Sequence, residues 1–199
     1  MKTTIIITSI LIISVIIFQS FTMRSTEKTE QQKYSVLEKD DNFEIRYYPK
    51  AILATVYSKA QSYKEIASPG FRKLAGYIFG GNEKNTGIAM TAPVHMNIND
   101  SISSMSFVMP SNYDIDNLPK PNDSNIEINY SKEEYVASIT YGGYSSDNDI
   151  KKYSAMLSEI LDKKGIKHSA NFRFLGYNPP YQFINRKNEI IVSIDYIKN

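Results

Sequence analysis

The chain has 199 residues, which is enough for one domain with its own hydrophobic core. Its net charge of +2 and the lack of a basic cluster with interleaved aromatics argue against a nucleic-acid partner. With no cysteine and only two histidines, disulfides, thiolate metal sites and cysteine nucleophiles are excluded, and no spacing of residues indicates a metal site. No pattern in the sequence indicates an oligomeric state.

An uncharged, apolar run occupies residues 3–23, between Lys2 and Arg24. As a helix it would be about 31 Å long, close to the thickness of the hydrocarbon core of a bilayer. Residues 1–23 are therefore expected to form either a single-pass membrane anchor or a cleaved signal peptide, with Ser20-Phe21-Thr22 as a weak cleavage site. An anchor would hold the protein at a membrane, whereas cleavage would release it as a secreted or periplasmic protein.

The orientation of such an anchor follows from its flanking charges. The short N-terminal flank favours an extracytoplasmic domain, whereas Arg24, Lys28 and Lys33 after the run favour the opposite orientation. Residues 24–33 are polar and are expected to be a linker. The folded domain is then expected to occupy residues 34–199.

The first half of that domain is expected to contain strands around one helix. Short strand patterns occur at residues 34–37, 43–47, 51–58, 94–98 and 105–109. A helix is expected at 61–79, with a break or kink at Pro69-Gly70. Its second half carries an apolar stripe at i, i+3, i+4 and i+7. These residues are Phe71, Leu74, Ala75 and Ile78.

The stretch GGNEKNTGIAMTAPV at Gly80–Val94 joins this helix to the next strand. Its first glycines are typical of a helix end, and its small residues indicate close backbone approach or the wall of a pocket. Three prolines and several Asn and Asp residues predict a surface loop at residues 110–125.

The second half repeats the first. Residues 126–130 echo 43–47, and 134–139 echo 51–56, at one shift of 83 positions. A second helix follows, with Ser146 and Asp147 as N-cap candidates and Gly165 as its C′ residue. Strands are expected at 172–177 and 189–196. Two copies of strand, strand, helix, strand, strand, packed face to face, would bury one core about a pseudo-twofold axis.

Four segments of this domain resemble the SOUL haem-binding protein family. They are GFRKLAGYIFGGNEKNTGIAMTAPV at 70–94, MSFVMPSNY at 105–113, GGYSSDNDI at 142–150 and YNPPYQFINRKNEI at 177–190. FEIRYYP at 43–49 is similar to the opening strand of that family. The resemblance implies an α+β fold, a distorted β-barrel of two pseudo-symmetric halves with the helices packed on the outside. It also implies non-covalent binding of haem or another tetrapyrrole.

The resemblance also implies a location for the ligand. It places haem in an apolar groove beside the first helix, lined by Phe71, Leu74, Ala75 and Ile78. The loop from Tyr181 to Phe183 would form the other wall, and Arg72, Lys73 and Arg186-Lys187 would pair with the propionates. Judged from the residues alone, core packing is the usual role of such a stripe, and a solvated surface is the usual place of such cations.

His95 is the candidate for an axial iron ligand. Strand alternation sets it opposite Val94 and Met96, so a role facing solvent or in a hydrogen bond is the alternative. His168 lies in a lysine-rich turn, and Met90, Met96 and Met109 are better explained as core fillers than as ligands.

A non-catalytic binding protein is the function expected from these observations, because no GxSxG, HExxH or phosphate-loop motif occurs. One alternative is a module that binds another bulky apolar or aromatic molecule between the two halves, since the fold is similar to that of bacterial effector-binding domains. A second alternative is a hydrolase or lyase that uses Glu83 or Glu189.

Overall fold

The computed structural model describes residues 2–196. Within this range the helices are α1 (Lys2–Lys28), α2 (Tyr63–Ile78) and α3 (Asp147–Lys163). The strands before α3 are β1 (Glu30–Gln31), β2 (Ser35–Lys39), β3 (Glu44–Tyr48), β4 (Ile52–Ser58), β5 (Thr91–Ala92), β6 (Val94–Asn97), β7 (Ser103–Val108), β8 (Ile126–Tyr130) and β9 (Glu134–Gly142). β10 (His168–Gly176) and β11 (Lys187–Ile194) follow it. The strands expected from alternation therefore form, with boundaries shifted by a few residues.

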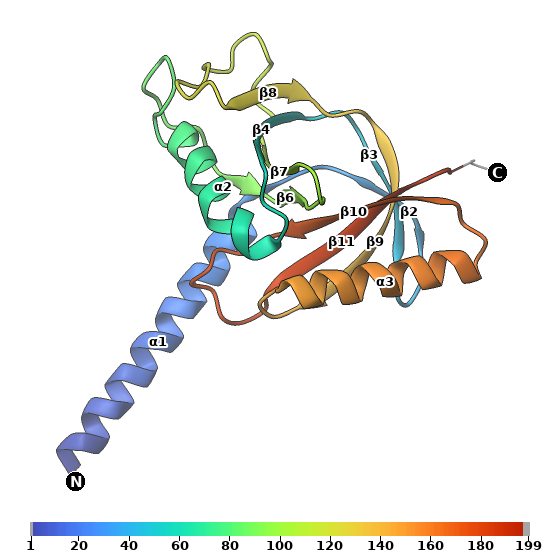
Figure 1. Cartoon of the computed structure of the whole chain (residues 1–199). Helices are drawn as coiled ribbons and strands as arrows, with labels where there is room; N and C mark the ends of the chain where they lie inside the picture. Colours follow the sequence, from blue (N-terminus) through green and yellow to red (C-terminus); the bar gives the residue numbers. More distant parts are fainter. Residues whose placement is uncertain (1, 197–199) are drawn as a thin grey trace.

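Nine strands form one curved antiparallel sheet in the order β2-β3-β9-β11-β10-β6-β7-β4-β8 (Figure 1). Each strand from β3 onwards in this order has a counterpart in the other half: β3 corresponds to β8, β4 to β9, β6 to β10 and β7 to β11. When counterparts are exchanged, these eight strands appear in the same order read from the opposite end, as a twofold axis requires. The predicted α+β fold with two pseudo-symmetric halves is thus confirmed.

The two halves are joined differently from the face-to-face packing expected from the sequence. β3 of the first half pairs with β9 of the second, β8 pairs with β4, and β6 pairs with β10 at the centre. The halves therefore share one sheet, because backbone groups at the edge of each half find partners in the other half. This arrangement could not be read from the repeat itself.

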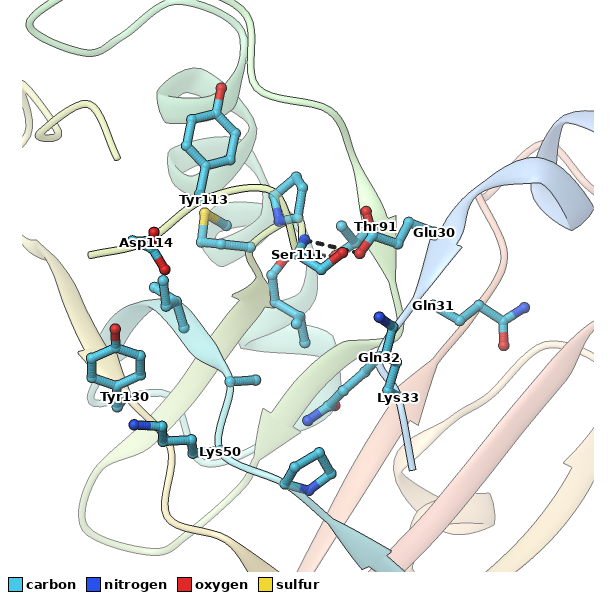
Figure 2. Close-up of a pocket in the computed structure, with 16 residues that line it drawn as sticks. Glu30, Gln31, Gln32, Lys33, Lys50, Thr91, Ser111, Tyr113, Asp114 and Tyr130 are labelled. Carbon is cyan, nitrogen blue, oxygen red and sulfur yellow. Dashed lines mark hydrogen bonds between the residues drawn. The ribbon is translucent and has the colours of Figure 1, made fainter. Parts of the chain in front are cut away.

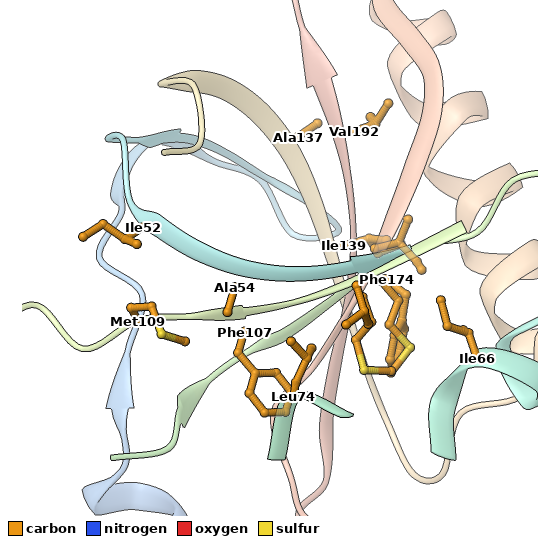
Figure 3. Close-up of a cluster of buried hydrophobic side chains, with 14 of the residues drawn as sticks. Ile52, Ala54, Ile66, Leu74, Phe107, Met109, Ala137, Ile139, Phe174 and Val192 are labelled. Atoms are coloured by element: carbon orange, nitrogen blue, oxygen red, sulfur yellow. The ribbon is translucent and has the colours of Figure 1, made fainter. Parts of the chain in front are cut away.

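Both α2 and α3 pack on one face of this sheet and enclose the main core (Figures 1 and 3). Leu74 from α2 and Leu157 and Leu161 from α3 are fully buried there. The opposite face carries a smaller apolar cluster, which includes Leu175 and Ile191. Residues that alternate along one strand therefore belong to two different environments.

Two expectations about local structure were wrong. Of the break or kink expected at Pro69-Gly70, the break does not occur, because α2 runs unbroken from Tyr63 to Ile78. Ile66 and Leu74 on either side of the proline are buried in the same core, and this packing outweighs the lost backbone hydrogen bond. Residues 24–33 are also not a free linker, because α1 continues to Lys28 and β1 pairs in parallel with β5.

The helix caps agree with the sequence. The Ser146 side chain accepts a hydrogen bond from the Asp149 backbone N–H, and the Asp149 carboxylate accepts one in return from the Ser146 N–H, forming a capping box. Gly165 follows the C-cap with a φ of +70°, the left-handed conformation expected of a C′ glycine.

The joint at Gly80–Val94 depends on two residues. A Cβ on Gly81 would lie 2.6 Å from the carbonyl oxygen of Gly76, so only glycine fits there. The fully buried Asn82 side chain donates hydrogen bonds to the carbonyls of Tyr77 and Thr86 and accepts them from the N–H groups of Lys84 and Thr86. This one amide therefore organises the whole turn.

We expect Asn82→Ala to lower the free energy of unfolding by about 1–3 kcal/mol, because buried backbone groups lose their partners. Urea denaturation measures this change. Asn42→Ala is the matched control, since Asn42 is exposed, and it should change stability by less than about 0.5 kcal/mol. Equal losses in the two variants would contradict the assigned role of Asn82.

Candidate ligand-binding site

The first predicted wall of the groove, on α2, is divided between core and surface. Leu74, Ala75 and Ile78 are buried among core residues, so they line no open groove in this structure. Phe71 is 39% exposed and its ring packs edge-on against Phe107, 5.3 Å between centroids. Of the four stripe residues, Phe71 is thus the one that a ligand could reach without rearrangement of the helix.

Arg72 and Lys73 lie exposed beside Phe71 on α2. Neither forms an ion pair with another residue in the described part of the chain. Their cationic groups are therefore available to an anionic ligand, as well as to water. Their pairing with an anionic ligand stays a prediction.

The second predicted wall is the loop between β10 and β11. Tyr181, Phe183 and Ile184 are each more than half exposed at its tip. Arg186 lies behind them, where its guanidinium donates hydrogen bonds to the carbonyls of Pro179 and Gln182 and stacks 4.2 Å from the centre of the Tyr144 ring. Arg186 therefore shapes the loop from within, and Lys187 is similarly engaged with Glu189.

The two walls remain separate in this structure. Among residues 2–196, no hydrogen bond, ion pair or aromatic contact joins Phe71, Arg72 or Lys73 to the loop. Their joint use by one ligand is thus a prediction that needs the ligand itself.

His95 lies on β6, on the face of the sheet away from the helices, opposite Leu175. Its Nε2 is 2.6 Å from Oε1 of Gln32, so in this arrangement Nε2 carries a proton and donates it. Burial lowers the pKa of His95 to about 3, and the charge of Arg173 acts in the same direction. The structure thus shows a neutral histidine in a hydrogen bond, which is the alternative role weighed for it.

We expect His95 to make stability depend on pH. Because its folded pKa lies below the usual 6.5, its contribution is complete above pH 6.5 and is lost as pH falls towards 3. Lowering the pH from 7 to 5 should therefore cost the protein about 1–2 kcal/mol through this group. Thermal or urea unfolding at both pH values measures it.

In His95→Gln this part of the loss should disappear. His168→Gln, at the other histidine, is the control and should keep the wild-type loss. If His95→Gln shows the same pH dependence as the unmodified chain, the neutral state assigned to His95 is incorrect.

A pocket of about 330 Å³ lies between residues 30–33 after α1 and the ends of β4, β7 and β8 (Figure 2). Lys33, Lys50 and Tyr130 line it together with apolar Ile52 and Val108. Its volume is at the small end of the range for ligand pockets, roughly 300–1,000 Å³. Sequence reasoning missed it because the residues come from five separate segments, with no shared motif.

A buried polar network was also missed. The Glu189 carboxylate is fully buried on the face away from the helices and receives two hydrogen bonds of 2.9 Å from the Arg46 guanidinium. The Tyr177 hydroxyl donates at 2.6 Å, Lys187 Nζ lies at 2.9 Å, and Thr140 donates at 3.2 Å. Two cations therefore surround one carboxylate.

The protonation states in this network follow from its contacts. Burial alone would raise the pKa of Glu189, but the hydrogen bonds and charge of Arg46 outweigh it and lower the pKa below its ordinary value. Burial and the Glu189 charge raise the pKa of Tyr48 to about 12. Glu189 is thus a carboxylate that is enclosed, paired and closed to a substrate.

Glu83, the other carboxylate considered for catalysis, lies exposed in the central turn. Its Oε1 accepts a hydrogen bond from the backbone N–H of Lys120. Both carboxylates therefore have partners that explain them as structural groups, an ion pair for Glu189 and a loop contact for Glu83.

Arg46→Met should destabilise the protein by about 3–5 kcal/mol, because it leaves the buried Glu189 with one cation instead of two. Adding Glu189→Gln should recover more than about 1 kcal/mol, since the charge is removed while an oxygen remains for Tyr177. Lys163→Met is the control, since it removes an exposed pair with Glu159, and should cost less than about 1 kcal/mol. No recovery in the double variant would argue against a charge effect.

α1 is long and apolar enough to cross a membrane, from Thr4 to Lys28, and only 6% of its most apolar window is buried against the domain. A signal sequence at the N-terminus has the same length and composition. The structure thus agrees with an N-terminal apolar helix and leaves both of its predicted uses open.

Comparison with known proteins matches residues 29–193 to the family described as SOUL heme-binding protein. The chain is 30% identical to heme-binding protein 1 of Xenopus laevis over 172 residues, which cover 82% of this chain and 90% of that protein. It is also 30% identical to heme-binding protein 2 of Mus musculus over 157 residues, covering 75% and 76%. The C-terminal domain of EcmrR has the same fold, with a TM-score of 0.61 at 10% identity over 82% of this chain and 99% of that structure.

Proposed function

This chain belongs to the SOUL haem-binding protein family, and we propose that it is a membrane-anchored, non-catalytic protein that binds haem or a related tetrapyrrole. The family match supports haem as the cofactor, and it spans nearly the whole folded domain. The relatives are named for haem binding and not for a reaction, which supports a binding function over a catalytic one.

The exposed residues fit the chemistry of this ligand. Haem presents a flat apolar ring with two propionates at one edge. Exposed Phe71, Tyr181 and Phe183 can cover an apolar ring, and Arg72 and Lys73 can pair with carboxylates. Apart from the family match, this combination of exposed aromatic rings and unpaired cations is the main observation on this chain that supports haem binding.

We place no axial bond between haem and His95, because its Nε2 is engaged with Gln32 and its ring lies on the face away from α2. Apolar contact and charge pairing would then hold the ligand, and related porphyrins without iron should bind as well.

The anchor in this proposal is α1, retained in the mature protein. The Gln19 side chain donates to the carbonyl of Tyr181 and accepts from the N–H of Phe183, and Thr26 donates to the side chain of Gln182. Cleavage at Ser20-Phe21-Thr22 would remove the first two of these bonds from the domain. The extracytoplasmic position of the domain is kept as part of this proposal.

Titration of the full chain in nanodiscs with hemin tests this function. We expect a saturable Soret shift at micromolar hemin, after subtraction of the signal from empty nanodiscs. The double variant Arg72→Glu/Lys73→Glu should weaken binding about tenfold, as two exposed charge pairs of up to about 1 kcal/mol each would do.

Lys151→Glu/Lys152→Glu on α3 is the matched control, because it makes the same charge change on the other helix. It should bind hemin as the unmodified chain does, and His95→Ala should leave the Soret position unchanged. Absence of a saturable shift would exclude haem, and equal weakening by both double variants would show that the charges on α2 act only through the net charge.

A further inference from the structure

The last turns of α1 present a polar stripe to the loop between β10 and β11. Gln19 and Thr22 are buried, at 3% and 4% exposure, within an otherwise apolar and exposed helix. Together with Thr26 they lie at i, i+3 and i+7, on one face. Phe18 adds a ring contact with Tyr181, 6.1 Å between centroids. The loop is therefore fixed to the apolar helix itself.

The position of these contacts along α1 sets the depth of the loop. Arg24 is the first charge after the apolar run, and Gln19 precedes it by five residues. At a rise of 1.5 Å per residue, this is about 7.5 Å along the helix, on the apolar side of the charge. When α1 spans a bilayer, the Gln19 contact therefore lies at the boundary between headgroups and acyl chains. Figure 1 shows the loop before β11 beside the upper end of α1.

Irregular backbone at this depth requires partners for its polar groups, because lipid supplies none. Side chains supply partners for six carbonyls of the loop. Arg186 donates to the carbonyls of residues 178, 179 and 182, and Gln182 donates to that of residue 184. Tyr144 donates to the carbonyl of residue 180, and Gln19 to that of residue 181. An ordinary surface loop would leave such carbonyls to water.

Three consecutive exposed positions of this loop, apart from buried Gln182, carry apolar side-chain surface, and the polar Asn185 after them is also exposed. Tyr181, Phe183 and Ile184 are exposed at 52%, 57% and 53%. Aromatic side chains are favoured at the interface between lipid headgroups and acyl chains. The loop thus combines an internally bonded backbone with an apolar outer surface, at the level where α1 meets the lipid.

We propose that the loop Tyr181–Ile184 is a lipid-contacting element, inserted into the bilayer interface beside α1. This proposal rests on the anchoring by α1 proposed above and is independent of haem binding. The partner that we assign to this loop is a phospholipid bilayer.

The chain contains no tryptophan, so a single introduced tryptophan reports its own environment. The full chain is placed in nanodiscs of phosphatidylcholine with bromine near the top of the acyl chains, without haem, and fluorescence quenching is measured against unbrominated nanodiscs. The reporters are Phe183→Trp and, as a second loop position, Ile184→Trp. Phe21→Trp reports on α1, and Tyr130→Trp at the end of β8 is the soluble control, since all these positions are exposed.

We expect quenching at both loop positions to reach at least half of that at Phe21→Trp, with Tyr130→Trp unquenched. If Phe21→Trp is quenched while both loop reporters match Tyr130→Trp, α1 anchors the protein but the loop does not contact lipid, and the proposal is wrong. If Phe21→Trp is also unquenched, anchoring itself fails and the proposal falls with it. Hemin binding is measured separately on the unmodified chain, so failure of the lipid contact and failure of haem binding are distinguished.

Discussion

The domain depends on strands that pair across its two halves. β3, β4 and β6 of the first half form ladders with β9, β8 and β10 of the second, so each half leaves unpaired edges and an open apolar face without the other. The buried ion pair also joins the two halves, because Arg46 belongs to the first half and Glu189 to the second. Hydrogen bonding and charge pairing therefore both require the two repeats to fold as one unit.

This shared sheet decides where function can reside. Its helical face is filled by the main core, and its other face is occupied by the paired Glu189 and by His95 in its bond to Gln32. The outer edge of α2, the loop before β11 and the pocket beside residues 30–33 remain accessible. Polar residues in the interior thus contribute to a rigid frame, and in the proposed function the ligand is bound by exposed aromatic and cationic side chains.

In the functions proposed above, membrane anchoring by α1 and ligand binding by this loop take place side by side. A ligand that partitions into lipid would meet Phe183 and Ile184 without crossing water, provided that α1 stays attached. Gln19 links the two properties, because its side chain is satisfied only by the loop backbone. By sequence alone, a polar residue near the end of an apolar run is unfavourable in a membrane span. In the structure, this polar residue has a specific partner.

The sequence by itself determined the strands, the helices with their caps, the repeat, the apolar N-terminal run and the family, because each follows from local periodicity or from contiguous motifs. It did not show that Leu74 and Ile78 are enclosed, since a stripe does not say what covers it. Only the tertiary structure decided the contacts between Arg46 and Glu189 and between Gln19 and Tyr181, which are 143 and 162 residues apart. Such pairs leave no periodic trace in one sequence, because their proximity arises from strand order and chain reversal, not from spacing along the chain.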